Sequence, residues 1–119
     1  MAEHAVPTAL VVDDDPHIRD LVARVLRRHG YDVRTAADGT EALAEVARDV
    51  PAVVVSDLVM PGMSGLELAG RLRAAAVPLP VVLFSASADP VKVPGVPFVP
   101  HPLRRERLLG AVAEALAAA

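Results

Sequence analysis

The stretch Ala9-Leu-Val-Val-Asp-Asp-Asp-Pro16 joins four apolar residues directly to three aspartates and a proline. An apolar run of this length predicts a short strand that is buried on both faces. Proline favours the first turn of a helix, so we expect a helix to begin at Pro16. The pattern therefore predicts a buried strand that has an acidic carboxyl end and leads straight into a helix.

Buried strands continue to alternate with amphipathic helices along the chain. Apolar residues at helical spacing after Pro16 predict a helix that stops near Gly30, because glycine commonly follows the last helical turn. This alternation predicts an α/β fold, a parallel sheet with right-handed crossovers and helices on both faces. We expect strands at residues 9–12, 31–36, 52–57, 80–84 and 96–99, and helices from residue 16 to a stop at Gly30, after residue 40, at 66–76 and over 104–116.

Length and composition limit the possible classes of protein. A chain of 119 residues is the size of one domain, so we interpret residues 1–119 as a single unit. The net charge of −3 provides no basic surface for a phosphate backbone, so a protein or small ionic partner is favoured over direct nucleic-acid binding. The absence of cysteine excludes disulfides, thiolate metal sites and cysteine nucleophiles.

The N-terminal residues bear on location. The first apolar run, Ala9 to Val12, is too short for a signal sequence or a membrane span. We therefore expect a cytoplasmic protein that does not contact a membrane.

Three aspartates, Asp13, Asp14 and Asp57, follow two of the predicted strands. The carboxyl ends of parallel strands meet at one edge of the sheet, where ligands of such folds bind. Crowded carboxylates repel one another unless a hard cation lies between them, and magnesium prefers oxygen ligands. The sequence therefore predicts a magnesium site at this edge. The alternative is helix capping, which we prefer for Asp15 because it directly precedes Pro16.

Three motifs resemble the receiver domain of two-component response regulators. They are Leu10-Val-Val-Asp-Asp-Asp-Pro16, Ala37-Asp-Gly-Thr-Glu-Ala-Leu43 and Ser56-Asp-Leu-Val-Met-Pro-Gly-Met-Ser-Gly65, and the last is highly specific. The resemblance covers nearly the whole chain. It implies a doubly wound, flavodoxin-like sheet of five parallel strands in the order 2-1-3-4-5.

The resemblance also implies roles for particular residues. Asp57 would accept a phosphoryl group from a sensor histidine kinase, a phosphotransfer protein or a small phosphodonor. Asp14, Asp57 and the backbone carbonyl of Val59 would bind magnesium directly, while Asp13 would act largely through water. Ser85 matches the hydroxyl residue that contacts the phosphoryl group, although a serine that caps a loop is the alternative.

Two features depart from the family pattern. His101 occupies the position of a lysine that pairs with the phosphoryl group, and its alternative is a side chain that points to solvent. Prolines punctuate residues 87–95, so the fourth helix is expected to be shortened or missing. Pro97 and Pro100 confine the last strand to a sheet edge. Phe98 matches an aromatic residue that turns inward on activation, although a lone phenylalanine in a strand is usually a core residue.

These observations favour a phosphoacceptor switch, acting alone or within a longer regulator, that signals to a downstream protein partner. A pseudo-receiver, which binds partners without phosphorylation, is the alternative. A magnesium-dependent phosphohydrolase would need a general acid near Asp57, yet inert Leu58 and Val59 follow it, so we do not expect an enzyme. The sequence leaves the oligomeric state open.

Overall fold

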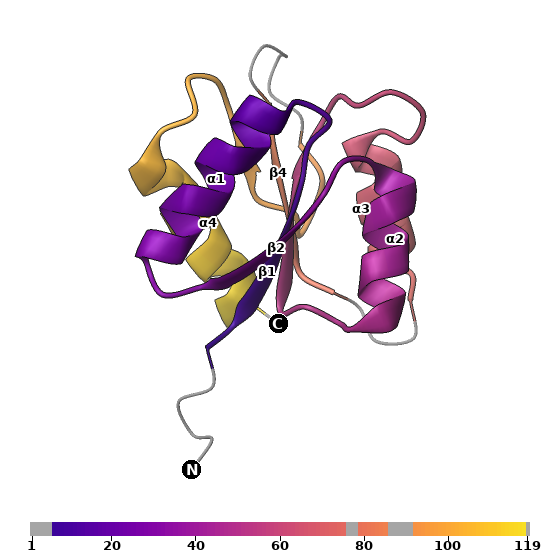
Figure 1. Cartoon of the computed structure of the whole chain (residues 1–119), viewed down its shortest axis with the longest axis horizontal. Coiled ribbons are helices and arrows are strands. Elements are labelled where there is room, and N and C mark those ends of the chain that lie inside the picture. Colours follow the sequence, from indigo (N-terminus) through magenta and orange to yellow (C-terminus); the bar gives the residue numbers. More distant parts are fainter. Residues whose placement is uncertain (1–5, 76–78, 86–91, 119) are drawn as a thin grey trace.

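The computed structural model describes residues 6–75, 79–85 and 92–118 (Figure 1). Within these residues strands and helices alternate up to the fourth strand, and a fifth strand and a last helix follow. The elements are β1 (Thr8–Val12), α1 (Pro16–Arg28), β2 (Asp32–Ala36), α2 (Gly39–Arg48), β3 (Val53–Asp57), α3 (Gly65–Arg73), β4 (Val81–Phe84), β5 (Phe98–Val99) and α4 (Arg105–Ala117). No helix in this described part combines the length and apolar character needed to cross a membrane.

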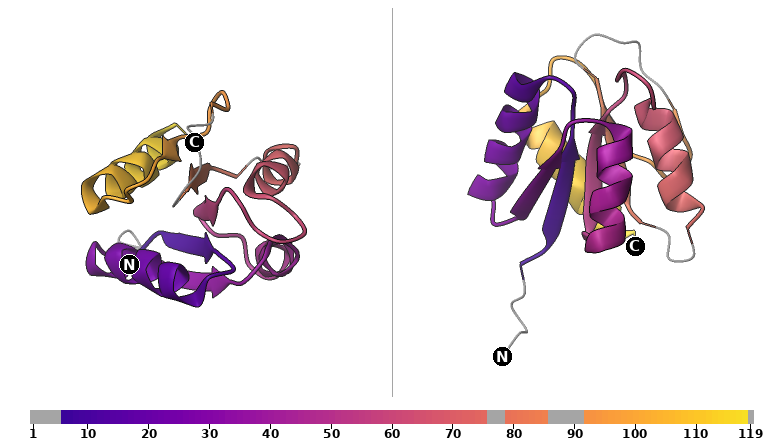
Figure 2. Two further views of the ribbon diagram at one scale, coloured as in Figure 1. Left: turned by 90° about the horizontal axis from the view of Figure 1, so that it is seen from above. Right: turned by 45° about the vertical axis from the view of Figure 1, so that its right-hand side comes forward.

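The five strands form one sheet in the order β2-β1-β3-β4-β5, and every neighbouring pair is parallel. Helices α1 and α4 cover one face, and α2 and α3 cover the other (Figure 2). This arrangement confirms the predicted flavodoxin-like α/β fold. It also places β1 and β3, the two strands that precede the aspartates, side by side at the centre.

Small aliphatic side chains build the core on both faces of the sheet. Successive strand residues point to opposite faces, so Val11 packs toward α1 and α4, whereas Leu10 and Val12 pack toward α2 and α3. All three are fully buried. The ends of the central strands are therefore held rigidly, and so are the residues that follow them.

Side-chain caps begin three of the helices at the carboxyl edge of the sheet. The carboxylate of Asp15 accepts a hydrogen bond from the backbone N–H of His17 at 2.8 Å, which confirms its predicted role as the cap of α1. Asp38 caps α2 and Ser64 caps α3 in the same way. Caps of this kind satisfy N–H groups that have no partner within the helix.

Helix α3 and strand β5 are each shorter than predicted by two residues. Helix α3 ends at Arg73, because the N–H of Ala75 bonds to the carbonyl of Leu72 and tightens the last turn; Ala76, the predicted end, lies outside the described residues. Strand β5 contains only Phe98 and Val99. Val96 instead donates to the carbonyl of Val93 in an antiparallel bridge.

The chain turns back before β5 because Gly95 has a φ of +80°, a conformation that favours glycine. As predicted, β5 lies at an edge of the sheet. Residues 92–95 form this turn rather than a helix. The remainder of the fourth crossover, residues 86–91, lies outside the described residues, so the shortened fourth helix stays a prediction.

Candidate functional site

The register of β1 and β3 brings the predicted aspartates together. Val12 pairs with Ser56 across the two strands, so Asp13 and Asp57 emerge next to each other at the carboxyl edge. Asp14 follows directly on the loop to α1. One carboxylate oxygen from each of Asp13, Asp14 and Asp57 lies within 4.8 Å of the others. We call these three residues the acidic triad.

Asp13 is the most firmly held member of the triad. Its side chain accepts a hydrogen bond from the N–H of Asp15 at 2.9 Å, and its own N–H donates to the carbonyl of Ala36 at 3.2 Å. Its carbonyl accepts a bond from Nη1 of Arg19 at 2.9 Å. Only 1% of Asp13 is exposed. The carboxylate is therefore fixed in position, whereas the neighbouring Asp14 is exposed.

The backbone of Asp57 is fixed by the loop that follows β3. The hydroxyl of Ser56 donates to the carbonyl of Asp57 at 2.9 Å, and the N–H of Gly65 donates to the carbonyl of Leu58 at 2.9 Å. The half-buried Asp57 carboxylate accepts a long bond, 3.4 Å, from the N–H of Val59. This weak contact leaves the carboxylate oxygens available for other partners.

Burial and mutual repulsion disfavour negative charge in the triad. Burial raises the pKa of Asp13 from its ordinary value of 3.8 to about 7; the bond from the Asp15 N–H opposes the rise, and the charges of Asp57 and Asp14 add to it. Burial is also the largest cause of the raised pKa of Asp57, and the charge of Asp14 adds to it. A hard cation would relieve both costs. Clustered carboxylate oxygens are the ligands that magnesium prefers, so the triad fits this ion.

The raised pKa of Asp13 predicts a pH-dependent stability in the absence of metal. The fold favours the protonated carboxyl, so this contribution is fully present below pH 4 and is lost as the pH rises toward 7. The full loss amounts to at most about 4 kcal/mol. Asp13→Asn does not titrate, so its free energy of unfolding relative to the natural protein should rise over this range. Urea denaturation in a metal chelator from pH 4.5 to 8 would measure the difference. A constant difference would contradict the prediction.

The remaining predicted site residues belong to β5 or follow β4 or β5. Ser85 follows β4, is 1% exposed, and donates its N–H to the carbonyl of Val99 at 3.2 Å. Phe98 is partly buried and packs against the core beneath α2 and α3. His101 is exposed and precedes a cis peptide bond to Pro102. The roles assigned to these residues and to the Val59 carbonyl stay predictions.

Arg19 was not identified from the sequence pattern. A charged residue on the polar side of an amphipathic helix is usually solvated, and nothing in the pattern around Arg19 distinguishes it from Asp20 or Arg24. Its contact with the carbonyl of Asp13 depends on how α1 is placed against the end of β1. Sequence patterns do not report that placement.

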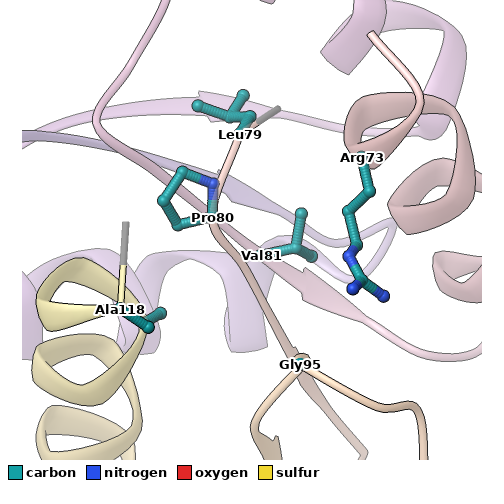
Figure 3. Close-up of a pocket in the computed structure, with 7 residues that line it drawn as sticks. Arg73, Leu79, Pro80, Val81, Gly95 and Ala118 are labelled. Carbon is teal, nitrogen blue, oxygen red and sulfur yellow. The ribbon is translucent and has the colours of Figure 1, made fainter. Parts of the chain in front are cut away.

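Figure 3 shows a separate pocket of this structure. It has a volume of about 150 Å³ and lies between the end of α3, the start of β4 and the end of α4. Arg73, Pro80 and Ala118 are among its lining residues, and none of the triad is. Because the pocket lies at the start of β4, it belongs to the amino edge of the sheet, whereas the acidic triad lies at the carboxyl edge.

Known proteins are similar to this chain in sequence and in fold. The model of the response regulator receiver domain family matches residues 9–111. Response regulator MprA of Mycobacterium leprae is 39% identical over 110 residues, which cover 87% of this chain and 48% of the relative. MtrA of Mycolicibacterium smegmatis, named a DNA-binding response regulator, is 40% identical over 84 residues, covering 71% of this chain and 36% of that protein.

Solved structures of receiver proteins have a similar fold. Chemotaxis protein CheY4 of Vibrio cholerae superposes with a TM-score of 0.83 at 32% sequence identity, over 94% of this chain and 100% of that one. The chain spans less than half the length of the two curated relatives. The family model nevertheless covers most of this chain. The chain belongs to the response regulator receiver domain family.

Proposed function

We propose that this chain is a phosphoacceptor switch of a two-component system and that Asp57 accepts the phosphoryl group. The observation that carries the proposal is the acidic triad, in which three carboxylates from two strand ends converge within 4.8 Å. A structural role accounts poorly for this arrangement, because burial first and neighbouring carboxylates second raise the pKa of Asp13 and that of Asp57. Family membership supplies the second support, since response regulators interact with sensor histidine kinases.

The proposed reaction is a transfer to a carboxylate. An oxygen of Asp57 forms a bond to the phosphorus, while the bond from phosphorus to the donor's histidine nitrogen or acyl oxygen breaks and its electron pair leaves with the donor. The half-buried Asp57 has a weak bond to Val59 and a fixed backbone, so its oxygen is both available and aligned. Positioning of this kind is the main protein contribution to phosphoryl transfer.

Magnesium is the cofactor that this proposal requires. Asp14, Asp57 and the backbone carbonyl of Val59 would hold it directly, and the buried Asp13 would act largely through water. Bound magnesium neutralises charge that would otherwise accumulate on the carboxylates and the phosphoryl oxygens. Its removal with a chelator should therefore abolish phosphorylation.

Ser85 and Phe98 are proposed to connect the acceptor to the surface. Ser85 follows β4, and the neighbouring Phe84 pairs with Asp57 across the sheet. The N–H of Ser85 bonds to β5 at Val99, and Phe98 precedes Val99 in that strand. A change at the acceptor could therefore reach β5, and from there a downstream protein partner. We place this signalling in the cytoplasm.

Intact-mass spectrometry tests the proposed function. The protein is incubated with magnesium and acetyl phosphate, and in parallel with a chelator in place of magnesium. A mass gain of one phosphoryl group, seen only with magnesium and lost on alkaline treatment, is expected. Beryllofluoride, which mimics the phosphoryl group without transfer, should shift amide resonances near Asp57. A protein that responds to neither reagent would be a pseudo-receiver.

His101 is the feature that favours the pseudo-receiver alternative. The family lysine carries a charged ammonium on a long flexible stem that can pair with a phosphoryl group, whereas the imidazole side chain is shorter and planar. His101 is also exposed. We propose that it replaces the lysine imperfectly, so that phosphorylation is retained but its coupling to β5 is weak.

Substitution of His101 by lysine tests its role. His101→Lys should raise the yield and lifetime of the aspartyl phosphate several-fold, because an ammonium can reach the phosphoryl oxygens. Phosphate yield after a fixed incubation and its decay after donor removal would be measured. His29→Lys, the same change at the end of α1, is the control and should alter neither quantity. Equal behaviour of the two variants would refute the role of His101.

A further inference from the structure

Arg19 holds the main chain at the end of β1. Its side chain leaves α1 and donates from Nη1 to the carbonyl oxygen of Asp13 at 2.9 Å. The side chain is half-buried, although most charged residues of α1 are exposed. The other hydrogen bonds of Asp13 among the described residues involve backbone N–H groups, so Arg19 is the residue whose side chain bonds to Asp13. The hydrogen bond that restrains the Asp13 carbonyl therefore comes from a residue six positions later in the sequence.

We propose that Arg19 is a positioning residue for the magnesium site, acting through the carbonyl of Asp13. The inference rests on the proposed function, since it concerns the same acidic triad. Residues that orient a metal ligand commonly contribute 10–100-fold to metal affinity. Arg19 would do so without touching the metal.

The geometry explains how the restraint reaches the carboxylate. The backbone of Asp13 is fixed on one side by the bond from its N–H to Ala36, and its side chain is fixed by the N–H of Asp15. Arg19 fixes the carbonyl that lies between those two contacts. Without it, the peptide between Asp13 and Asp14 could rotate, and both carboxylates would lose their mutual alignment.

Helix α1 gives Arg19 a rigid base. The backbone N–H of Arg19 bonds to the carbonyl of Asp15 at 2.9 Å, the residue that caps the helix. Arg19 therefore links the first turn of α1 to the end of β1, through its backbone N–H and through its side chain. The planar guanidinium also loses less conformational freedom per hydrogen bond than a lysine would.

A positioning role and a charge effect of Arg19 predict opposite changes in magnesium affinity when Arg19 is removed. Within the described residues, Arg19 makes no ion pair with a carboxylate, and its bond goes to a neutral carbonyl. If Arg19 acted mainly through its positive charge, its removal would tighten magnesium binding, because like charges repel. If it acts by positioning, its removal should weaken binding.

The surroundings of Arg19 tolerate a smaller side chain. It borders an open groove of about 360 Å³ along α1, whose other lining residues include Ala23, Arg27 and Thr35. Shortening the side chain therefore widens a solvent-filled groove and does not create a buried cavity. We expect Arg19 variants to fold.

The first test measures magnesium affinity by calorimetry. Arg19→Met retains the aliphatic stem and removes the donor, and it should weaken magnesium binding about tenfold. The control is Arg24→Met, which removes an equally charged residue of α1 that pairs with Asp20 in solvent. It should change the affinity less than twofold. Unchanged or tighter binding in Arg19→Met would overturn the proposal.

The second test needs no metal. Amide hydrogen exchange in a chelator should be about tenfold faster at Asp13 and Asp15 in Arg19→Met, with protection in the centre of β1 unchanged. Arg19→Lys, which retains one donor without the fork, should lie between the natural protein and Arg19→Met in both tests. Any other order, or equal exchange, would count against Arg19. Failure of the natural protein to bind magnesium would instead contradict the proposed function, and the exchange result would still stand.

Discussion

Asp57→Asn is expected to abolish magnesium-dependent incorporation of a phosphoryl group. The amide is nearly isosteric with the carboxylate but has no anionic oxygen to attack phosphorus. The same change removes one charge from the triad, so the raised pKa of Asp57 predicts that the metal-free variant is more stable than the natural protein at pH 8. Intact-mass spectrometry and urea denaturation in a chelator would measure the two effects. Loss of activity with a gain in stability separates a missing nucleophile from a misfolded protein.

Asp15→Asn is the matched control for this experiment. Asp15 lies next to the triad, but its carboxylate caps α1, and asparagine caps helices about as well as aspartate. The control variant should therefore incorporate a phosphoryl group at close to the natural level. Incorporation that persists in Asp57→Asn would show that Asp57 is not the acceptor.

Gly65→Ala is expected to destabilise the protein by about 3 kcal/mol or more and to impair phosphorylation. A Cβ atom at Gly65 would overlap the carbonyl oxygen of Asp57 and would lie 2.9 Å from the Cα atom of Leu58. Both are main-chain atoms, so neither can move aside as a flexible side chain could. Relief of the clash must shift α3 or the end of β3, and the second shift displaces the Asp57 carboxylate. Chemical denaturation and phosphoryl yield would be measured together.

Gly70→Ala, a change in the same helix, provides the control. A Cβ atom at Gly70 would meet no other atom within 4 Å. Alanine has a higher helix propensity than glycine, so this variant should be more stable by about 0.5–1 kcal/mol and should accept a phosphoryl group normally. Equal effects of the two substitutions would show that the close approach at Gly65 is unimportant.

Local patterns were sufficient to predict the main elements of the fold. Runs such as Ala9 to Val12 are apolar throughout because parallel strands at the sheet centre are covered on both faces. Pro16 and the preceding Asp15 marked the start of α1 because capping depends on a few adjacent residues. The convergence of Asp13 and Asp57 followed from one topological rule, that parallel strands end at the same edge.

The sequence pattern was least informative where a contact between distant residues decides where a strand or helix ends. Val96 is as apolar as Val99 and was expected in the last strand, yet it bridges back to Val93 because Gly95 reverses the chain. A strand exists only where it meets a partner, and the partner's position depends on the packing of the whole sheet. The ends of α3 and β5 were therefore the least accurate predictions.

The sequence by itself determined the order of the elements, the parallel α/β class and the identity of the acidic triad. These features depend on the period of apolar residues and on the residues next to each strand end, whereas the strand order 2-1-3-4-5 was implied by the resemblance to receiver domains. Tertiary structure alone decided the burial that raises the pKa of Asp13, the reach of Arg19 to its carbonyl, and the contact that requires glycine at position 65. Each depends on distances between packed backbones, which no local pattern encodes.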